Sequence, residues 1–251
     1  MKKHASKTLI FLSFILIAFY PSNHGLKAGS QKVYQPTIGE IICQEPGYHC
    51  LTIESKIEKI EKKTKHGVKI IEVETAPIWA DLWPNDTERE IIMKVNRLNI
   101  KLKPGMIIAM PNDLVNKTFM DFSPYPKEAD SLNEKFLIFD PKLLAWAAYN
   151  AEGKLVRWGP ASGGKPGYHT PAREFRIFKK AGPKCRSSKY DAPMPWAMFF
   201  HKAGYAFHGS PNVPGKNASH GCVRLFNEDA EWLNKNFIEV GTKVIIRPYT
   251  E

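Results

Sequence analysis

The stretch HGSPNVPGKNASHGCVRL, residues 208–225, places one cysteine and two histidines where they could carry out nucleophilic chemistry. A nucleophilic cysteine needs a base or an imidazolium beside it, because a free thiol is almost entirely protonated at neutral pH. His208 and His220 could each supply that group. Gly221 lets the backbone approach a reacting carbonyl, and the amide groups around Gly221 and Cys222 could form an oxyanion hole. The spacing therefore predicts acyl transfer through Cys222.

The same three side chains are also zinc-ligand types, so a metal site is the first alternative. No fourth ligand follows at a useful spacing, and the sequence His220-Gly221-Cys222 would crowd two ligands together. We therefore predict neither a metal ion nor a cofactor. A disulfide between Cys185 and Cys222 is the second alternative, which we do not expect because the residues around Cys222 are arranged for chemistry.

With a histidine, a spacer and then Ser-His-Gly-Cys followed by Val and Arg, the chain resembles the YkuD-type L,D-transpeptidases. The resemblance extends upstream to FLIFDPKLLAWAAYNAEGKLVRWGPASGG, to HTPAREF, and to APMPWAMFF with GYAFHGS, and it covers residues 133–248. One residue departs from the family pattern: Arg173 stands where glycine is usual. The resemblance implies a YkuD-like β-sandwich with one late helix, and an enzyme that acts on peptidoglycan.

The resemblance also implies a role for each residue of the motif. Cys222 would be the nucleophile that accepts the acyl group, and His208 would be the base that exchanges its proton. The carbonyl of Gly209 would orient the His208 ring by accepting its Nδ1 proton. The residues expected to line the substrate pocket and the oxyanion site are Ser219, His220, Gly221 and Arg224.

Structural interpretations stay open for three of these pocket residues. Ser219 could be a turn residue, His220 could buttress the cysteine turn, and Arg224 could form a surface ion pair. In the functional interpretation, Arg224 presents a planar fork to a stem-peptide carboxylate. Because an imidazole at hydrogen-bond distance favours the thiolate, we expect Cys222 to alkylate below about pH 8, and removal of the His208 ring to raise that profile.

The resemblance implies two-step acyl transfer, in which a peptidoglycan stem tetrapeptide loses its terminal D-alanine and an amine resolves the thioester. The acceptor stays open: another stem peptide, a lysine of an envelope protein, a free D-amino acid or water. Glycan strands are a further candidate partner. The alternative function is a noncatalytic peptidoglycan-binding or host-interaction protein on the same fold, and the completeness of the motif argues against it.

Strand patterns are dense from residue 135 onward, which predicts that residues 133–251 form a mainly β catalytic domain. The segments KFLIFD, LLAWAAYN and KLVRWGPAS predict three strands, and WAMFFHKAG with YAFHGS predicts a hairpin. EFRIFKKAG and the closing GTKVIIRPY are further strand candidates. One helix interrupts them, because Asn227 is a good N-cap for EDAEWLNKNF.

Residues 68–112 predict a small α/β module with the strand VKIIEVE, a helix that opens at Asn85 or Asp86, and the short strand IIAMP. This order resembles a divergent LysM module, a small fold that binds glycans; a packing domain without a ligand is the alternative. The residues that carry the resemblance are Asn96, Asn99, Pro104 and Gly105. We expect the module to add cell-wall affinity without adding chemistry, and residues 113–132, which contain two prolines, to form a linker.

Residues 29–67 form a mixed N-terminal segment ahead of that module. Cys43 and Cys50 are expected to pair as a disulfide after export. The following run, IESKIEKIEKKTK, has isoleucines at spacings of four and three, which predicts a solvated helix or linker with one apolar stripe.

Residues 1–28 have a basic start and an apolar run from Thr8 to Tyr20, which is typical of a secretory signal. As a helix this run spans about 20 Å, less than the ~30 Å hydrocarbon core of a bilayer. We therefore expect export to the periplasm or cell envelope, with an uncleaved signal anchor as the alternative. Part of the net charge of +11 comes from the four lysines of this segment, and the other basic residues are dispersed, so we predict no nucleic-acid partner.

Overall fold

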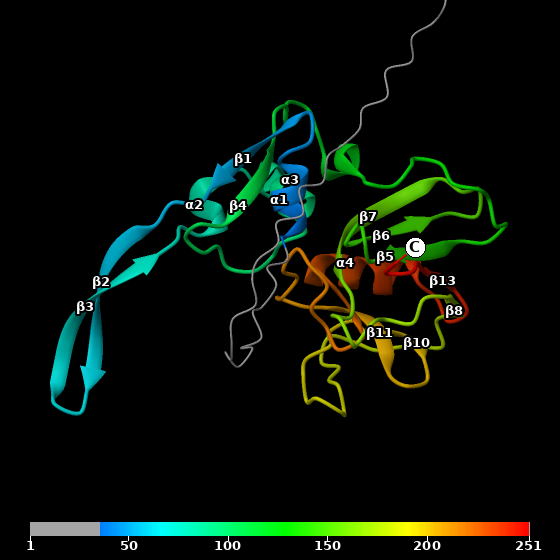
Figure 1. Ribbon diagram of the computed structural model, residues 1–251. Helices are drawn as coiled ribbons and strands as arrows, with labels where there is room; N and C mark the ends of the chain where they lie inside the picture. The colour runs from blue at the N-terminus through cyan, green and yellow to red at the C-terminus, as the bar shows by residue number, and fades with distance from the viewer. Residues whose placement is uncertain (1–35, 251) are drawn as a thin grey trace, which may run out of the picture. The chain divides into compact units, whose positions relative to one another are not determined.

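The C-terminal half of the chain forms one nine-stranded sheet (Figure 1). The computed structural model describes residues 36–250. The strands of this sheet are β5 (Phe136–Asp140), β6 (Ala145–Tyr149), β7 (Leu155–Ser162), β8 (Glu174–Arg176), β9 (Lys179–Lys180), β10 (Met198–His201), β11 (Tyr205–Gly209), β12 (Val223–Leu225) and β13 (Lys243–Ile246). Their spatial order is β8-β13-β5-β6-β7-β12-β11-β10-β9. The prediction that the C-terminal half of the chain is mainly β is confirmed.

Two pairs of neighbouring strands in this sheet are parallel, β5 with β13 and β11 with β12, and the other pairs are antiparallel. The predicted late helix is present as α4 (Asn227–Trp232), which continues into a π-helical turn, η2 (Leu233–Phe237). Its N-cap is Phe226, so the predicted cap Asn227 is the first helical residue instead. Ala230 and Leu233 of this helical segment pack against one face of the sheet.

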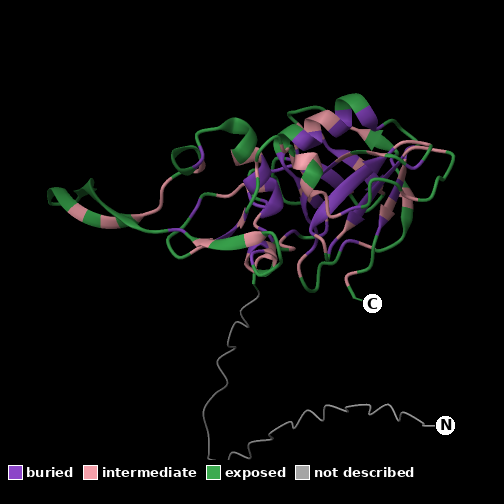
Figure 2. Ribbon diagram, turned by 90° about the horizontal axis from the view of Figure 1, so that it is seen from above, coloured by how far each residue is buried: buried purple, intermediate pink, exposed green. Residues whose placement is uncertain are grey.

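Both faces of the central strands are covered, and Figure 2 shows these strands as buried. All five residues of β6 are buried, which requires apolar cover on both sides of the sheet. The second cover comes from the predicted linker, residues 113–132, which contains the short helix η1 (Phe119–Phe122). Within it, the Tyr125 hydroxyl donates to the carbonyl of Ala145 at 2.7 Å, and the Phe119 carbonyl accepts from Trp158 Nε1 at 2.8 Å. This segment therefore packs on the sheet as well as connecting the two parts of the chain.

The N-terminal elements are α1 (Ile38–Ile42), β1 (Tyr48–Thr52), α2 (Trp79–Leu82), α3 (Asp86–Val95) and β4 (Ile107–Pro111). Helix α3 begins where predicted, because the Asn85 side chain accepts the amides of Thr87 and Glu88 at 3.0 and 3.1 Å. The expected disulfide joins Cys43, at the end of α1, to Cys50 in β1.

The strand paired with β4 is β1, whereas the predicted module began with the strand at residue 68. The module boundaries and the LysM-like interpretation stay predictions. The signal segment predicted for residues 1–28 lies outside the described residues. Among residues 36–250, no helix is long and apolar enough to cross a bilayer.

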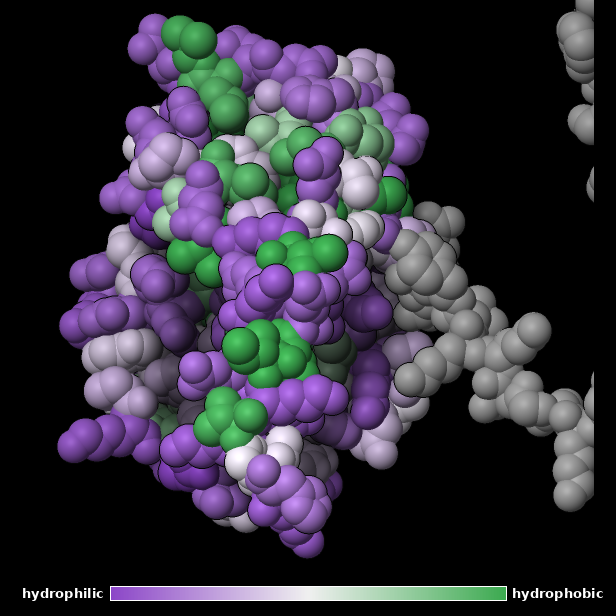
Figure 3. Space-filling model, turned by 90° about the vertical axis from the view of Figure 1, so that its left-hand side faces the viewer, coloured by the Kyte–Doolittle hydropathy of each residue, from purple (hydrophilic) through white to green (hydrophobic). Residues whose placement is uncertain are grey.

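The prediction of a helix or linker in IESKIEKIEKKTK is wrong. Residues 56–64 form β2 (Lys56–Thr64), which pairs along its whole length with β3 (Gly67–Thr75). Of the three isoleucines of the stripe, only Ile53, which precedes β2, is buried in a core. Ile57 and Ile60 are 71% and 42% exposed, and the β-branched run that follows offers them a complementary strand instead. In Figure 1 this hairpin extends away from the other elements, and Figure 3 shows apolar side chains among charged ones on this side of the molecule.

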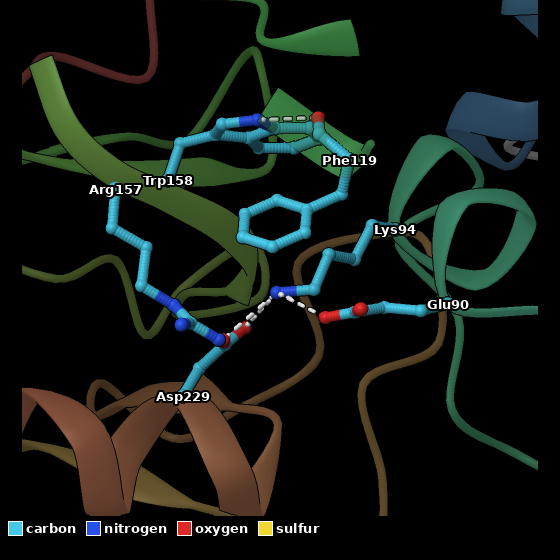
Figure 4. Close-up of polar contacts among 6 residues, drawn as sticks. All are labelled: Glu90, Lys94, Phe119, Arg157, Trp158 and Asp229. Carbon is cyan, nitrogen blue, oxygen red and sulfur yellow. Dashed lines mark hydrogen bonds and ion pairs between the residues drawn. The ribbon is translucent and has the colours of Figure 1, made fainter. Parts of the chain in front are cut away.

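A buried ion cluster joins α3 to the nine-stranded sheet and to α4 (Figure 4). Lys94 of α3 is 2% exposed, and its Nζ donates to both carboxylate oxygens of Asp229 in α4, at 2.8 and 3.1 Å. Arg157 of β7 donates to the same carboxylate at 3.0 Å. Glu90 lies 3.6 Å from Lys94 Nζ, and the Phe119 ring lies 4.1 Å from it. The cluster ties the N-terminal module to the helix that follows the catalytic strand β12.

We predict that Lys94→Met lowers the free energy of unfolding by about 3 kcal/mol, because it removes one partner of a buried charge pair. Urea unfolding followed by tryptophan fluorescence measures the change. The matched control is Lys59→Met in the hairpin, where the ion pair with Glu72 is exposed and should matter little. Equal unfolding midpoints for the two variants would contradict a stabilising role of the cluster.

Candidate active site

The sheet brings the predicted catalytic residues together at the pairing of β11 with β12. These strands are parallel, with His208 directly opposite Arg224, and Cys222 immediately precedes β12. All three side chains line one cavity of about 360 Å³. The remaining lining comes from two loops and the cysteine turn, and consists of Ser187, Tyr190, Ala192, Pro193, Met194, Ser210, Pro211, Asn212, Ser219 and His220.

The His208 ring is held in one orientation by the carbonyl predicted for that role. Nδ1 lies 2.8 Å from the Gly209 oxygen, so Nδ1 carries the proton that is donated and Nε2 is the acceptor of the neutral ring. The side chain is buried, and burial lowers the pKa of His208 to about 4. The bond to Gly209 opposes that shift, and the nearby Arg224 adds to it. His208 is therefore a neutral base at physiological pH.

Gly209 itself has no room for a side chain. A Cβ at this position would lie 2.5 Å from Oδ1 of Asn227, which is the first residue of α4. The Gly209 amide donates to the Pro195 carbonyl at 2.8 Å, which fixes the peptide whose oxygen holds the imidazole. Close packing against α4 thus orients the catalytic base.

The Cys222 thiol donates a weak hydrogen bond to the Gly204 carbonyl, with the sulfur 3.6 Å from the oxygen. Burial raises the pKa of this thiol, although a backbone hydrogen bond from Ala206 and the charge of Arg224 act in the opposite direction. The described residues form no hydrogen bond between the sulfur and the His208 ring. The raised pKa is opposite in direction to the thiolate expected from the motif, and in this state a neutral thiol and a neutral ring share the cavity. The expected pH profile of alkylation stays a prediction.

The turn before the cysteine is held by Ser219. Its hydroxyl donates to the Cys222 carbonyl at 2.6 Å and accepts from the Gly221 amide at 2.9 Å. Gly221 has φ of 121°, and a Cβ there would lie 2.2 Å from Tyr205 Cε1, so only glycine fits. These bonds favour the turn interpretation of Ser219. They also differ from the oxyanion prediction for Gly221, because its amide already has an acceptor.

His220 lies exposed between two tyrosines at the cavity. Its ring is edge-on to Tyr168, with centroids 4.9 Å apart, and stacked on Tyr190 at 5.3 Å. Neither tyrosine belongs to the cysteine turn, so these contacts differ from those expected if His220 supported that turn. The sequence analysis assigned no role to either tyrosine, and Tyr190 lies in a loop that shows no chemical pattern.

Arg224 is half-buried and has no acidic partner among the described residues, which contradicts the surface ion-pair interpretation. Its Nη1 donates to the carbonyl of Asn212 at 3.4 Å. Burial lowers the pKa of Arg224, and the negative charge of the neighbouring Cys222 sulfur, in its ionised form, raises it. An unpaired guanidinium in a cavity is a site for a carboxylate or another anion.

Thr170 and Tyr249 were missed by sequence reasoning, although both support the cysteine turn. Thr170 Oγ1 donates to the Gly221 carbonyl at 2.8 Å, and the Tyr249 hydroxyl donates to Thr170 Oγ1 at 3.0 Å. Thr170 belongs to the HTPAREF segment, so the family resemblance offered a signal for it; Tyr249 had none. Cys185 is a free thiol, and the disulfide alternative with Cys222 is absent.

No group of three His, Cys, Asp or Glu side chains within residues 36–250 is placed to hold a metal ion. The cavity presents a thiol, an imidazole oriented by a backbone carbonyl, and a guanidinium.

Comparison with known proteins gives a family for this part of the chain. Residues 137–246 match the YkuD family model, described as the L,D-transpeptidase catalytic domain, which confirms the resemblance there. The probable L,D-transpeptidase 3 of Mycobacterium tuberculosis is 30% identical over 103 residues, which cover 35% of this chain and 38% of that protein. The chain thus spans less than half the length of this curated relative.

Solved structures of the same class are also similar. The L,D-transpeptidase (residues 123–326) from Xylanimonas cellulosilytica is 26% identical, with a TM-score of 0.48, and the match covers 62% of this chain and 77% of that one. The catalytic domain of the E. faecium L,D-transpeptidase is 22% identical, with a TM-score of 0.41, covering 46% of this chain and 98% of that one.

We predict that iodoacetamide labels Cys222 slowly at neutral pH and that the rate rises only above the pH at which an ordinary thiol ionises. A raised pKa leaves less thiolate at any given pH, and thiolate is the reactive form. His208→Ala should not raise the labelling midpoint further, because the neutral ring provides no positive charge to lose. The measurement is labelling rate against pH by peptide mass spectrometry, with Cys185 in the same sample as the reagent control. A wild-type midpoint below about pH 8 would restore the thiolate interpretation.

Proposed function

Since residues 137–246 match the L,D-transpeptidase catalytic domain, we propose that the protein transfers an acyl group from a peptidoglycan stem tetrapeptide to an amine through a Cys222 thioester. One observation carries the proposal: a thiol, an imidazole oriented by a backbone carbonyl, and an unpaired guanidinium line the same 360 Å³ cavity. These are the nucleophile, the base and the carboxylate-binding group that acyl transfer from a peptide acid requires.

The first half-reaction begins with a neutral pair. The Cys222 thiol turns from the Gly204 carbonyl and transfers its proton to Nε2 of His208 as the sulfur attacks the peptide carbonyl before the terminal D-alanine. A sulfur–carbon bond forms, and the carbonyl π electrons move to oxygen. The amide of Cys222 is our candidate oxyanion donor, because the Gly221 amide is bound to Ser219. The carbon–nitrogen bond then breaks, His208 returns the proton to the leaving amine, and D-alanine departs.

The second half-reaction reverses the roles. An acceptor amine loses a proton to His208 and attacks the thioester carbonyl, and the carbon–sulfur bond breaks as the thiol regains its proton. The low pKa of His208 keeps the ring neutral and makes the protonated ring a strong acid toward the leaving group, although it also makes the neutral ring a weak base. The candidate acceptors are a second stem peptide, a lysine of an envelope protein, a free D-amino acid and water. Analysis of the muropeptides of a deletion strain distinguishes among them.

We also propose that the protein works outside the cytoplasm, since its substrate class is there and residues 1–28 have the pattern of a secretory signal. Cell fractionation with N-terminal sequencing of the mature protein tests both export and cleavage. Recovery of the intact chain from the cytoplasm alone would overturn the proposed location.

The nucleophile is tested by trapping the acyl-enzyme. Wild-type protein incubated with a tetrapeptide, or with a carbapenem that acylates enzymes of this type, should gain the mass of one acyl group at Cys222. Cys222→Ala should gain none, and His208→Gln should acylate about 100-fold to 10,000-fold more slowly, because the general base is lost. An adduct on Cys185, or none on the wild type, contradicts the mechanism.

The carboxylate-binding role is tested with Arg224→Lys. Lysine keeps the charge but lacks the bidentate fork, so activity on a stem peptide should fall about tenfold or more while the protein stays folded. The comparison substrate is the same peptide amidated at the recognised carboxylate, on which the variant and the wild type should differ little. An equal loss on both substrates would show that Arg224 holds the protein loop and not the ligand.

A further inference from the structure

The chain that follows α3 lies beside one wall of the catalytic cavity. The Asn99 amide donates to the Val213 carbonyl at 3.1 Å, and the Gly215 amide donates to the Arg97 carbonyl at 3.0 Å. Between them, Leu98 forms an antiparallel bridge with Pro214. Residues 97–99 of the N-terminal module are thus paired, backbone to backbone, with residues 213–215. The loop that lines the cavity, residues 210–213 (the cavity loop), ends where this pairing begins.

The Asn99 side chain also bonds to the cavity loop itself. Its Nδ2 donates to the Ser210 carbonyl at 2.7 Å, and its Oδ1 accepts from the Val213 amide at 2.7 Å. One side chain therefore bridges the two ends of the loop, with both halves of its amide used. Val213 is fully buried, so removing the Asn99 amide would leave a buried donor without an acceptor.

The cavity loop in turn orients the guanidinium of Arg224. Ser210, Pro211 and Asn212 line the cavity, and the Asn212 carbonyl accepts from Arg224 Nη1 at 3.4 Å. Among the described residues this carbonyl is the only hydrogen-bond acceptor of the Arg224 side chain. The direction in which Arg224 presents its fork thus depends on where the loop holds Asn212.

We propose that Asn99 is a positioning residue for Arg224, acting through the cavity loop, so that the N-terminal module completes the carboxylate-binding side of the active site. The proposal rests on the function above for the role of Arg224. It differs from the expectation that the N-terminal module adds affinity alone: a side chain of that module fixes a wall of the catalytic cavity. Loosening the loop should weaken the binding of a carboxylate substrate before it weakens chemistry at Cys222.

Asn96 provides a matched control three residues away. It is fully buried, and its Nδ2 donates to the carbonyls of Ile92 and Ala109, both at 2.8 Å. Its Oδ1 accepts from the Ala109 amide at 2.7 Å. All its bonds stay inside the N-terminal module, so Asn96→Ala weakens the module without touching the cavity loop.

The test compares two reagents that alkylate the same sulfur. In both reactions the Cys222 thiolate displaces iodide, but iodoacetate carries a carboxylate and iodoacetamide does not. The ratio of their rates is independent of how much thiolate is present, and it reports the attraction of an anion by Arg224. This readout does not require transpeptidase activity, and Asn96→Ala controls for a general loss of stability.

We expect the wild-type ratio of iodoacetate to iodoacetamide rates at Cys222 to exceed that of glutathione. Asn99→Ala should lower this ratio about threefold to tenfold, toward the value of Arg224→Gln. A guanidinium that moves away from the cavity attracts the carboxylate of iodoacetate less, because the distance is longer and more water screens the two charges. Asn99→Ser is neutral and keeps a short hydroxyl in place of the amide, so its ratio should fall between those of Asn99→Ala and the wild type, and it serves if the alanine variant does not fold. On a stem peptide, Asn99→Ala should raise KM with little change in kcat.

An unchanged ratio in the Asn99 variants, or an equal fall in Asn96→Ala, overturns the positioning role. A wild-type ratio equal to that of glutathione overturns it too, together with the carboxylate role of Arg224. If the ratios behave as expected but no acyl-enzyme forms, the positioning role stands and the proposed transpeptidase function fails.

Discussion

The hydrogen bond between His208 Nδ1 and the Gly209 carbonyl is the contact on which the rest of the site depends. In a buried ring without a carboxylate beside it, this bond decides which nitrogen can take a proton. It holds only if the Gly209 peptide is fixed, which Pro195 achieves by accepting its amide and α4 by packing against its Cα. The parallel pairing of β11 with β12 then places Cys222 and Arg224 at the same cavity. A backbone carbonyl thus has the orienting role that a carboxylate has in other triads.

Burial sets the electrostatics of this arrangement. It lowers the pKa of the imidazole, raises that of the thiol and leaves the guanidinium as the one charge of the three. A neutral thiol and a neutral base separate charge only as the reaction proceeds, so the resting site avoids an ion pair in a poorly solvated cavity. Support for the cavity comes from the N-terminal module, through the Lys94–Asp229 cluster and the pairing of residues 97–99 with 213–215.

The sequence allowed prediction of whatever a short segment determines by itself. Cys222, His208 and Gly209 follow from one local motif, and the strands of the C-terminal half follow from alternation and turn residues. Strand β3 was predicted, but its partner β2 was missed, because Ile57 and Ile60, at helical spacing, also fit a strand when no core is present to select a helix. Contacts between distant segments could not be predicted: Asn99 meets Ser210 across more than a hundred residues, and Tyr190 meets His220 through a loop without a pattern. The direction of the Cys222 pKa shift depends on burial, which the motif does not encode.

The most direct test of this account is nitrogen NMR of the His208 side chain as a function of pH, in protein labelled at histidine and assigned with the His208→Gln variant. The account predicts a pKa of about 4, with the proton of the neutral ring on Nδ1. A pKa at or above the ordinary value of 6.5, or a neutral ring protonated on Nε2, would contradict it. The first result would mean that burial does not keep the ring neutral, and the second that the Gly209 carbonyl does not orient the base.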